Sequence, residues 1–403
     1  MKIIVRVMRA FLVYSAVVIG LCAQMVPVPL RKNYPCDISF MIVDLKYDVG
    51  RLKVCEFGMG CLSGFVGHER LYGAGKIWEG WWSFVHTFGK PLIFVARSGP
   101  TRSFQELSVP HKDKKKDKMA LQKMFTLPGI RVATLQDGLK ALSLTKHYGE
   151  GFQAIAMKTE PRELFEQYAA LGEGETGVIA VDYATSSFAL NKLYMHTLFV
   201  NDPAVARYRP QCRLLYKNNV VQDLETINAI MPADAYVIKP INAWKGEDIQ
   251  MSLACDLVET SKNILWKNRT CMFIESLEHS MPIIVDAKPY DATMRVALGL
   301  AYDQGNVTMK VLGAYWKLPV EPLTEQVSLL GSFLSRICKG GRTSSAIVDS
   351  KTLAGVSYQL AQFMPHVYKK MVALKHSHIP LQELVSVIDG TADAALIKRL
   401  ETL

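Results

Sequence analysis

Apolar and polar positions alternate most clearly in residues 37–58, whose sequence is DISFMIVDLKYDVGRLKVCEFG. Two runs rich in β-forming residues lie on either side of a short segment, residues 48–50, that ends in a glycine. Strand-forming runs around such a segment predict a β-hairpin. A glycine-rich loop is expected next, over residues 58–76, and a buried strand over residues 90–99.

Between residues 129 and 200, short apolar runs alternate with segments of helical periodicity. The run TGVIAVDYA (residues 176–184) is of the first kind, and PRELFEQYAALGE (residues 161–173) is of the second. Alternation of this kind is typical of an α/β layer with a parallel sheet. A further helix is predicted over residues 191–200.

A second unit begins near residue 212 and contains several strand-like runs with few helices between them, which favours antiparallel pairing. The last sixty residues have largely helical periodicity. The sequence therefore predicts an α/β (α+β) fold. The expected division of the chain is into residues 1–30, 31–88, 89–200, 201–345 and 346–403.

The composition indicates a globular protein but does not identify its function. The 403 residues are 49% hydrophobic and 21% charged, which is typical of a globular chain. The net charge of +10 suits an anionic partner such as a nucleotide, and equally suits simple solubility. The basic run at residues 111–118 is interrupted by aspartates and lacks nearby aromatic residues, so no specific nucleic-acid partner is expected. Eight cysteines without a CxxC pair argue against a structural zinc site.

The first thirty residues require separate treatment. Lys2, Arg6 and Arg9 precede an uncharged run over residues 10–30. This pattern fits a signal peptide, a membrane anchor that brings residues 10–30 into contact with lipid, or an extension upstream of a functional chain that begins near Met25. The location of the protein is left open: export or anchoring follows if the segment is a signal.

Residues 237–249, VIKPINAWKGEDI, place Lys239 at the end of an apolar strand. A lysine in such a run generally requires an anionic partner. Lys245 and Gly246 follow in a loop that suits a flap closing over phosphates. The alternative is an ordinary surface lysine before a turn.

Charged residues recur at the ends of the following strands. Glu275 and Glu278 follow an apolar run, Asp291 and Arg295 are four positions apart, and Lys317 ends another strand. This order resembles the ATP-grasp ligases over roughly residues 191–345. The resemblance implies a Rossmann-like α/β layer before the ATP-grasp unit and a helical C-terminal segment.

The resemblance also implies roles for these residues. Lys239, Lys245 and Gly246 would bind the ATP phosphates. The segment with Glu275, Leu277 and Glu278 would hold adenine and ribose, and Arg295 and Lys317 would act on the transferred phosphate.

Members of the family also bind Mg²⁺ through an aspartate and a Glu-x-Asn motif, and the C-terminal segment offers no such motif. Asp44 and Glu56 on the N-terminal hairpin are similar to that pair. The alternative is that both are solvent-facing acids on an ordinary hairpin. The arrangement resembles circularly permuted ATP-grasp enzymes such as glutathionylspermidine synthetases. Gly58 stands where the family has the asparagine.

The leading hypothesis is an ATP-dependent ligase that phosphorylates a small carboxylate and joins it to an amine or thiol. ATP chemistry of this kind favours a cytoplasmic location and so opposes export. His68 and Arg70 in the glycine-rich loop are the candidates for contact with the substrate. Two alternatives remain. One is an ATP-binding module with little or no turnover. The other is an exported interaction protein, suggested by residues 1–30 and by the glycosylation sequons at Asn268 and Asn306.

Overall fold

The computed structural model describes residues 37–59, 65–73, 76–87, 93–95, 130–132, 192–200, 202–241, 248–267, 271–303, 305–323 and 344–375, and residues 383, 395, 396 and 399. Several sequence predictions lie outside these residues. They include the segment 1–30, the basic run 111–118, the helical segment 161–173, the apolar run 176–184, the loop residues Lys245 and Gly246, and the sequon at Asn268. None of the described helices is long and apolar enough to span a membrane.

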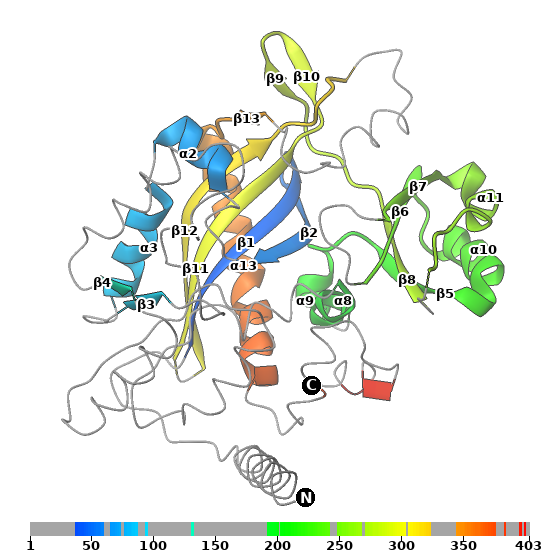
Figure 1. The fold of residues 1–403 in the computed structure, drawn as a ribbon, viewed down its shortest axis with the longest axis horizontal. Coiled ribbons are helices and arrows are strands. Elements are labelled where there is room, and N and C mark those ends of the chain that lie inside the picture. Colours follow the sequence, from blue (N-terminus) through cyan, green and yellow to red (C-terminus); the bar gives the residue numbers. More distant parts are fainter. Residues whose placement is uncertain are drawn as a thin grey trace, which may run out of the picture.

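An antiparallel five-stranded sheet forms the centre of the described structure (Figure 1). Its order is β13 (Ser345–Ala346), β12 (Asn306–Lys317), β11 (Thr293–Asp303), β1 (Asp37–Asp48) and β2 (Arg51–Met59). The predicted hairpin is confirmed: β1 pairs with β2, and Gly50 in the intervening turn has φ 78°, a conformation that glycine adopts readily. The hairpin joins strands that follow it by more than two hundred residues.

Helices cover both faces of this sheet. On one face, α13 (Ser350–Lys375), α8 (Lys192–Val200) and α9 (Pro203–Ala206) bury an apolar core that includes Val43, Val296 and Phe363. On the other face lie α2 (Val66–Tyr72) and α3 (Lys76–His86), where the Trp81 ring meets Phe40 edge to face, with centroids 5.5 Å apart. Most of β1 is therefore buried on both sides.

Helix α2 corrects the prediction of a glycine-rich loop over residues 58–76, because residues 66–72 are helical. The glycine inside this helix has a packing role. A Cβ at Gly67 would collide with the Tyr315 ring and with Ser345 Oγ, so glycine lets α2 approach β12 and β13 closely. High glycine content here reflects close contact between elements.

A second antiparallel sheet lies to one side of the first (Figure 1). Its order is β5 (Cys212–Tyr216), β8 (Cys271–Ser276), β6 (Ala235–Lys239) and β7 (Gln250–Leu253). Helices α10 (Val220–Ile230) and α11 (Leu257–Ser261) flank it, and Leu224 and Leu257 belong to its apolar core. The expectation of antiparallel strands beyond residue 212 is confirmed.

Two smaller strand pairs complete the described structure. β9 (Ile283–Val285) and β10 (Lys288–Tyr290) form a hairpin that projects from the body (Figure 1). β3 (Ile93–Val95) and β4 (Ile130–Val132) are parallel, and β4 lies at the start of residues 129–200, where a parallel sheet was expected. The described fold is therefore mixed α+β.

Candidate functional site

Four of the predicted site residues lie on one face of the five-stranded sheet. Asp44 in β1 is the cross-strand partner of Glu56 in β2 and of Arg295 in β11. Lys317 in β12 is opposite Thr293, two residues from Arg295. Cross-strand partners share a face, and so do residues two apart along a strand. The sheet thus brings together side chains more than 250 positions apart in sequence.

Asp44 binds two cations at once. Arg295 Nε and Nη2 donate to Asp44 Oδ1 and Oδ2, each at 2.7 Å, in a bidentate pair. Lys317 Nζ donates to Oδ2 at 2.9 Å. The Asp44 side chain is only 6% exposed, whereas those of Arg295 and Lys317 are 21% and 16% exposed. The two cations therefore reach the surface while the carboxylate between them does not.

The charge of Asp44 follows from these contacts. Burial would raise the pKa of its carboxyl, but the cations of Arg295 and Lys317 outweigh burial and hold the pKa well below its ordinary value. Burial likewise acts to lower the pKa of Arg295, and Asp44 reverses this effect. The three side chains form a charged group with one net positive charge.

A second carboxylate cluster lies in the four-stranded sheet. Glu275 in β8 accepts from Arg209 Nη2 at 2.9 Å and from Lys239 Nζ. All three side chains are almost fully buried. Burial would raise the pKa of Glu275, but Lys239 and Arg209 hold it below its ordinary value.

Lys239 thus has a partner within the protein. It lies at the end of a buried strand, as predicted, and its ammonium is bound by Glu275. The two residues were expected to contact phosphate and the nucleoside separately. Lys192, at the start of α8, lies near the same cluster. Its burial lowers the pKa of its ammonium, while Glu56 and Glu275 act in the opposite direction.

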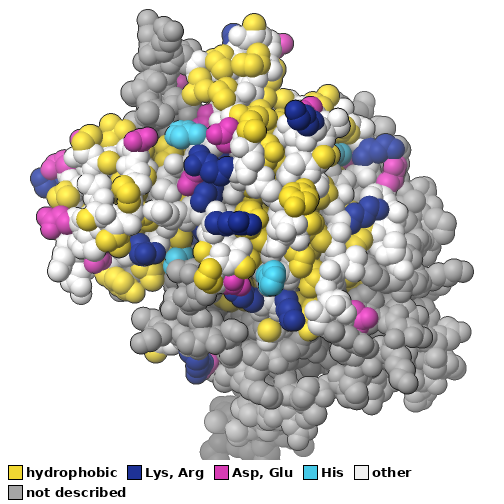
Figure 2. All heavy atoms as spheres, turned by 180° about the vertical axis from the view of Figure 1, so that it is seen from behind, with side chains coloured by type: hydrophobic (Ala, Val, Ile, Leu, Met, Phe, Trp, Pro, Cys, Tyr) yellow, Lys and Arg dark blue, Asp and Glu magenta, His cyan; other side chains and the backbone are white. Residues whose placement is uncertain are grey.

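The two sheets meet at β2. Arg209 Nη1 donates to the carbonyl oxygens of Val54 and Cys55 at 2.7 and 2.8 Å, and Val54 N donates to Tyr208 O at 2.7 Å. The Cys55 thiol lies close enough to Lys239 for the charge of that lysine to affect its pKa. The hairpin with Asp44 and Glu56 is therefore adjacent to the strand of Lys239. Figure 2 shows charged side chains gathered where the two parts of the molecule meet.

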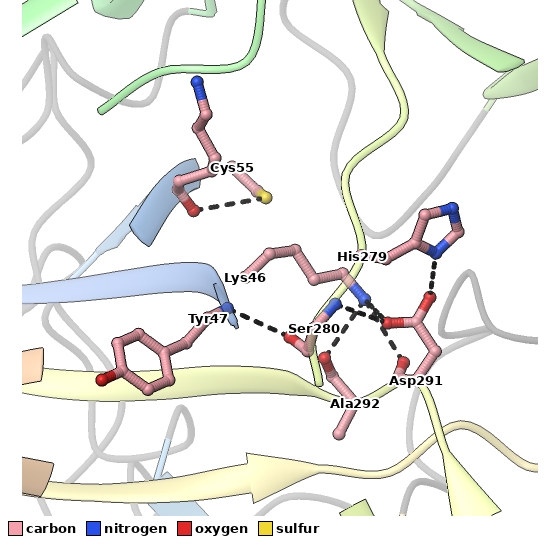
Figure 3. A network of polar contacts seen from close by, with 8 residues as sticks. Lys46, Tyr47, Cys55, His279, Ser280, Asp291 and Ala292 are labelled. Atoms are coloured by element: carbon pink, nitrogen blue, oxygen red, sulfur yellow. Dashed lines mark hydrogen bonds and ion pairs between the residues drawn. The ribbon is translucent and has the colours of Figure 1, made fainter. Parts of the chain in front are cut away.

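A third cluster ties the segment after β8 to β1 (Figure 3). Asp291 Oδ1 accepts from Lys46 Nζ at 2.8 Å and from Ser280 N at 3.0 Å, and Oδ2 lies 2.8 Å from His279 Nδ1. Burial would raise the pKa of Asp291, but His279 and Lys46 hold it below its ordinary value. Tyr47 N also donates to Ser280 Oγ. These contacts fix the exit from the four-stranded sheet against the five-stranded one.

Leu277 and Glu278, two of the three residues expected to hold the nucleoside, lie in the segment after β8. Leu277 N donates to Ala235 O, so Leu277 can contact a base only through its carbonyl group or side chain. Ser276 Oγ donates to Glu278 at 3.3 Å, and the Glu278 side chain is half-buried.

The two residues predicted to contact the substrate differ in exposure. His68 is 5% exposed and stacks on Tyr72, with ring centroids 4.4 Å apart. Burial lowers the pKa of His68 to about 4, so the ring is neutral at pH 7. This is the environment of a packed core histidine. Arg70, on the same helix, is exposed.

The predicted Mg²⁺ ligands do not fit a resident metal as they are arranged. Both oxygens of Asp44 are bound by cations, and a Mg²⁺ ion there would be repelled by Arg295 and Lys317. Glu56 is exposed and shares the face of Asp44. Within the described part of the chain, no three acidic, histidine or cysteine side chains group as a metal site would require.

Several residues of these clusters were not predicted as site residues. They are Lys46, Lys192, Arg209, His279 and Asp291. Asp291 had been noted in the sequence because it lies four positions before Arg295, but no role was assigned to this residue. Arg209 lies in an irregular segment before β5, where no periodicity marks it.

Comparison with known proteins found similar structures but no sequence relatives. No family model matches the chain, and no curated protein matches it. A protein described as a gamma-glutamylcysteine synthetase from Methylobacillus flagellatus aligns with 9% identity over 85% of this chain and 90% of its own, at a TM-score of 0.41. The D-alanyl-alanine synthetase A of Vibrio cholerae aligns with 8% identity over 75% and 98%, at 0.38.

A third similar structure is a RimK domain ATP-grasp protein from Sphaerobacter thermophilus. It aligns with 13% identity over 70% of this chain and 98% of its own, at a TM-score of 0.27. These values assign no function to the chain.

Proposed function

We propose that this protein is an ATP-dependent ligase of the ATP-grasp type. It would transfer the γ-phosphate of ATP to a small carboxylate substrate. An amine or thiol would then attack the acyl carbon, so that a C–N or C–S bond forms, the C–O bond to phosphate breaks and phosphate leaves. ADP and phosphate are the other products.

One observation carries this proposal: Asp44, Arg295 and Lys317 converge on one sheet face beside the second charged sheet. The permuted ATP-grasp resemblance predicts that the N-terminal hairpin and the strands of Arg295 and Lys317 act together. Polyphosphate recognition requires cations held in a fixed geometry at a partly exposed position, which Arg295 and Lys317 provide.

Catalysis in such a site consists mainly of positioning and charge neutralisation. Arg295 and Lys317 would bind the phosphate oxygens and stabilise the charge on the transferred group. Because Lys239 is paired with Glu275, its role toward phosphate is indirect: the pair fixes the end of β6, from which residues 242–247 continue. Lys245 and Gly246 are the proposed phosphate-binding residues of that segment.

The proposed contacts with the nucleoside and with the carboxylate substrate follow from where the candidate residues lie. Leu277 and Glu278 would line the nucleoside end. Arg70 is the better candidate of its helix for contact with a carboxylate substrate, since His68 is buried and neutral. No step is assigned to a metal at Asp44, whose carboxylate is bound by two cations.

A second candidate function is nucleotide binding without turnover. It is favoured by Gly58, which stands where the family has an asparagine, and by the engaged oxygens of Asp44. Both candidates require ATP to bind at Arg295 and Lys317, and they differ in whether phosphate is released.

Isothermal titration with ATP tests the requirement common to both candidates. The parent protein should bind ATP, and Lys317→Met should weaken binding by about 10- to 100-fold, which is the loss of one charge-assisted contact. Lys310→Met is the matched control, because Lys310 is an exposed lysine on the same strand. A parent protein that does not bind ATP, or a Lys317 variant that binds as tightly as the parent, contradicts the proposal.

Phosphate release then separates the two candidates. The assay would screen pairs of amino acids, as carboxylate and as amine, with ATP and Mg²⁺. Release that depends on both supports the ligase. ATP binding with no release across the screen favours the binding module.

A further inference from the structure

The carboxylate of Asp44 is in an unusual position for a metal ligand. Three donors from two cations occupy it: two from Arg295 at 2.7 Å and one from Lys317 at 2.9 Å. The pKa of Asp44 lies below its ordinary value because these cations outweigh the effect of burial. An oxygen bound in this way is a poor ligand for Mg²⁺, which must approach against two positive charges.

The two cations are held differently. Arg295 uses two nitrogens on two oxygens, a rigid planar pairing. Lys317 contacts Asp44 at one oxygen, Oδ2, which also accepts from Arg295 Nη2, and the Lys317 side chain is 16% exposed. A lysine has a flexible stem and a point charge, so it can change partner without disturbing the sheet.

We propose that Asp44 is an internal counter-ion that holds Lys317 in place for a polyphosphate ligand, and that it is not a metal ligand. When a polyphosphate binds, Lys317 Nζ leaves Asp44 Oδ2 and binds a phosphate oxygen, while the bidentate Arg295–Asp44 pair remains. Asp44 thereby keeps two neighbouring cations close together when no ligand is bound. Its negative charge also opposes binding of the anion.

This inference deepens the proposed function, yet part of it can be tested without ATP. Asp44→Asn removes the negative charge that Arg295 and Lys317 share, so this variant should have a higher affinity for an anion. At an effective dielectric constant of about 20, a unit charge roughly 5 Å away changes an interaction by enough to expect a gain of at least about tenfold. If Asp44 were a metal ligand, the same substitution would lower affinity for the magnesium complex of ATP, because one ligand of the metal would be lost.

The experiment is calorimetric titration of the parent protein and Asp44→Asn with tripolyphosphate, with ATP in EDTA, and with ATP in Mg²⁺. The expected result is a gain for tripolyphosphate and metal-free ATP, and a smaller gain for the magnesium complex, which carries less negative charge. Asp48→Asn is the matched control, an exposed aspartate on the same strand that should change nothing.

A double-mutant cycle makes the test specific. The gain from Asp44→Asn should be smaller when Lys317→Met is also present, because the lysine released from Asp44 produces part of that gain. If Asp44 had only a structural role, its substitution would not raise affinity for tripolyphosphate. If a folded Asp44→Asn protein binds tripolyphosphate as tightly as the parent or more weakly, the inference is wrong. If the variant binds ATP more weakly only when Mg²⁺ is present, Asp44 is a metal ligand after all.

A crystal structure of the parent protein with tripolyphosphate provides a test that needs no variant. Lys317 Nζ should contact a phosphate oxygen and lie beyond hydrogen-bond distance of Asp44. An intact Lys317–Asp44 contact with the ligand bound elsewhere contradicts the inference. If the parent binds tripolyphosphate but not ATP, the proposed function fails while the inference stands. If the parent binds ATP and Asp44→Asn shows no gain, only the inference fails.

Discussion

Asp44 and Glu275 are both buried carboxylates placed between two cations, and they differ in what surrounds those cations. Around Asp44, the Arg295 and Lys317 side chains are 21% and 16% exposed. Around Glu275, those of Arg209 and Lys239 are 2% and 8% exposed. Water and ligands can reach the first pair of cations, whereas the second pair is enclosed.

This difference separates a binding arrangement from a structural one. Arg209 also donates to two carbonyl groups of β2, so the Glu275 cluster fastens the two sheets together. The Asp44 cluster lies within a single sheet and contributes less to the connection between sheets. The two ion triads are similar in composition and differ in whether a ligand could reach their cations.

The largest expected effect is on the enclosed cluster. Glu275→Gln leaves Arg209 and Lys239 buried without a counter-charge, and we expect it to lower the free energy of unfolding by about 3–5 kcal/mol. Asp44→Asn should cost less, because water can solvate Arg295 and Lys317. Urea denaturation of both variants measures this. Equal losses for the two variants would show that exposure does not distinguish the clusters.

The second prediction compares one lysine from each cluster. Lys317→Met should lose ATP affinity by an amount equivalent to about 1.5–3 kcal/mol, with little change in stability. Lys239→Met should lose stability and retain most ATP affinity, since its ammonium is bound by Glu275. Calorimetric titration and thermal unfolding of both proteins test this. The reverse result would assign phosphate contact to Lys239.

The third prediction uses a histidine beside the enclosed cluster. Burial, with Arg209 and Arg213, lowers the pKa of His196 to about 4, below the ordinary value of 6.5. Between these values the unfolded chain binds a proton that the folded protein does not, so stability falls as pH falls from 6.5 to 4. The contribution is on the order of 2 kcal/mol.

His196→Asn removes this titration while keeping a polar atom near Cys212 Sγ, which lies 2.8 Å from His196 Nδ1. Denaturation at pH 7 and pH 4.5 should show a smaller pH-dependent loss for the variant than for the parent. An identical loss would mean that other groups control stability in this range, His68 among them.

The smallest effect is expected at Gly58. A Cβ there would lie 3.3 Å from Ile42 Cβ and Cγ2, a tight contact that a small shift relieves, so Gly58→Asn should cost about 1 kcal/mol or less. If Asp44 is not a metal ligand, the asparagine should leave the Mg²⁺ dependence of ATP binding unchanged. A lowered Mg²⁺ requirement would support the metal pair of Asp44 and Glu56.

The sequence predicted local elements better than their partners. Alternation in residues 37–58 was sufficient for the hairpin, since period-2 patterning is a local property. It could not show that β1 lies beside β11, which is about 250 residues away. The family resemblance grouped the hairpin with the ATP-grasp unit but did not specify this pairing. Helix α2 was missed because glycine was taken as a sign of a loop, while Gly67 allows close contact with Tyr315.

Three of the candidate site residues lie together because of strand register. Asp44, Arg295 and Lys317 stand at strand positions, so cross-strand register unites them once the strands are neighbours. The partner of Lys239 was not anticipated, because Glu275 meets it across paired strands, β6 and β8, that are separated along the chain by β7. Arg209 is in an irregular segment, where sequence patterns say nothing about which carbonyl groups it will reach.

The strand order of the central sheet also has a consequence for synthesis. β2 follows β1 after a short turn, so these two strands can pair early. β11, the other neighbour of β1, is made much later, since Asp44 and Arg295 are 251 positions apart. At roughly 5–20 residues per second, the ribosome takes about 10–50 s to make that interval. During this time the inner edge of β1 is unpaired, and its apolar side chains lack the cover of α13. An isolated hairpin is marginally stable in water, and an unpaired apolar edge favours aggregation. The strand that carries Asp44 is therefore the first of its sheet to be made, and it stays partly uncovered until β11 and α13 have been made.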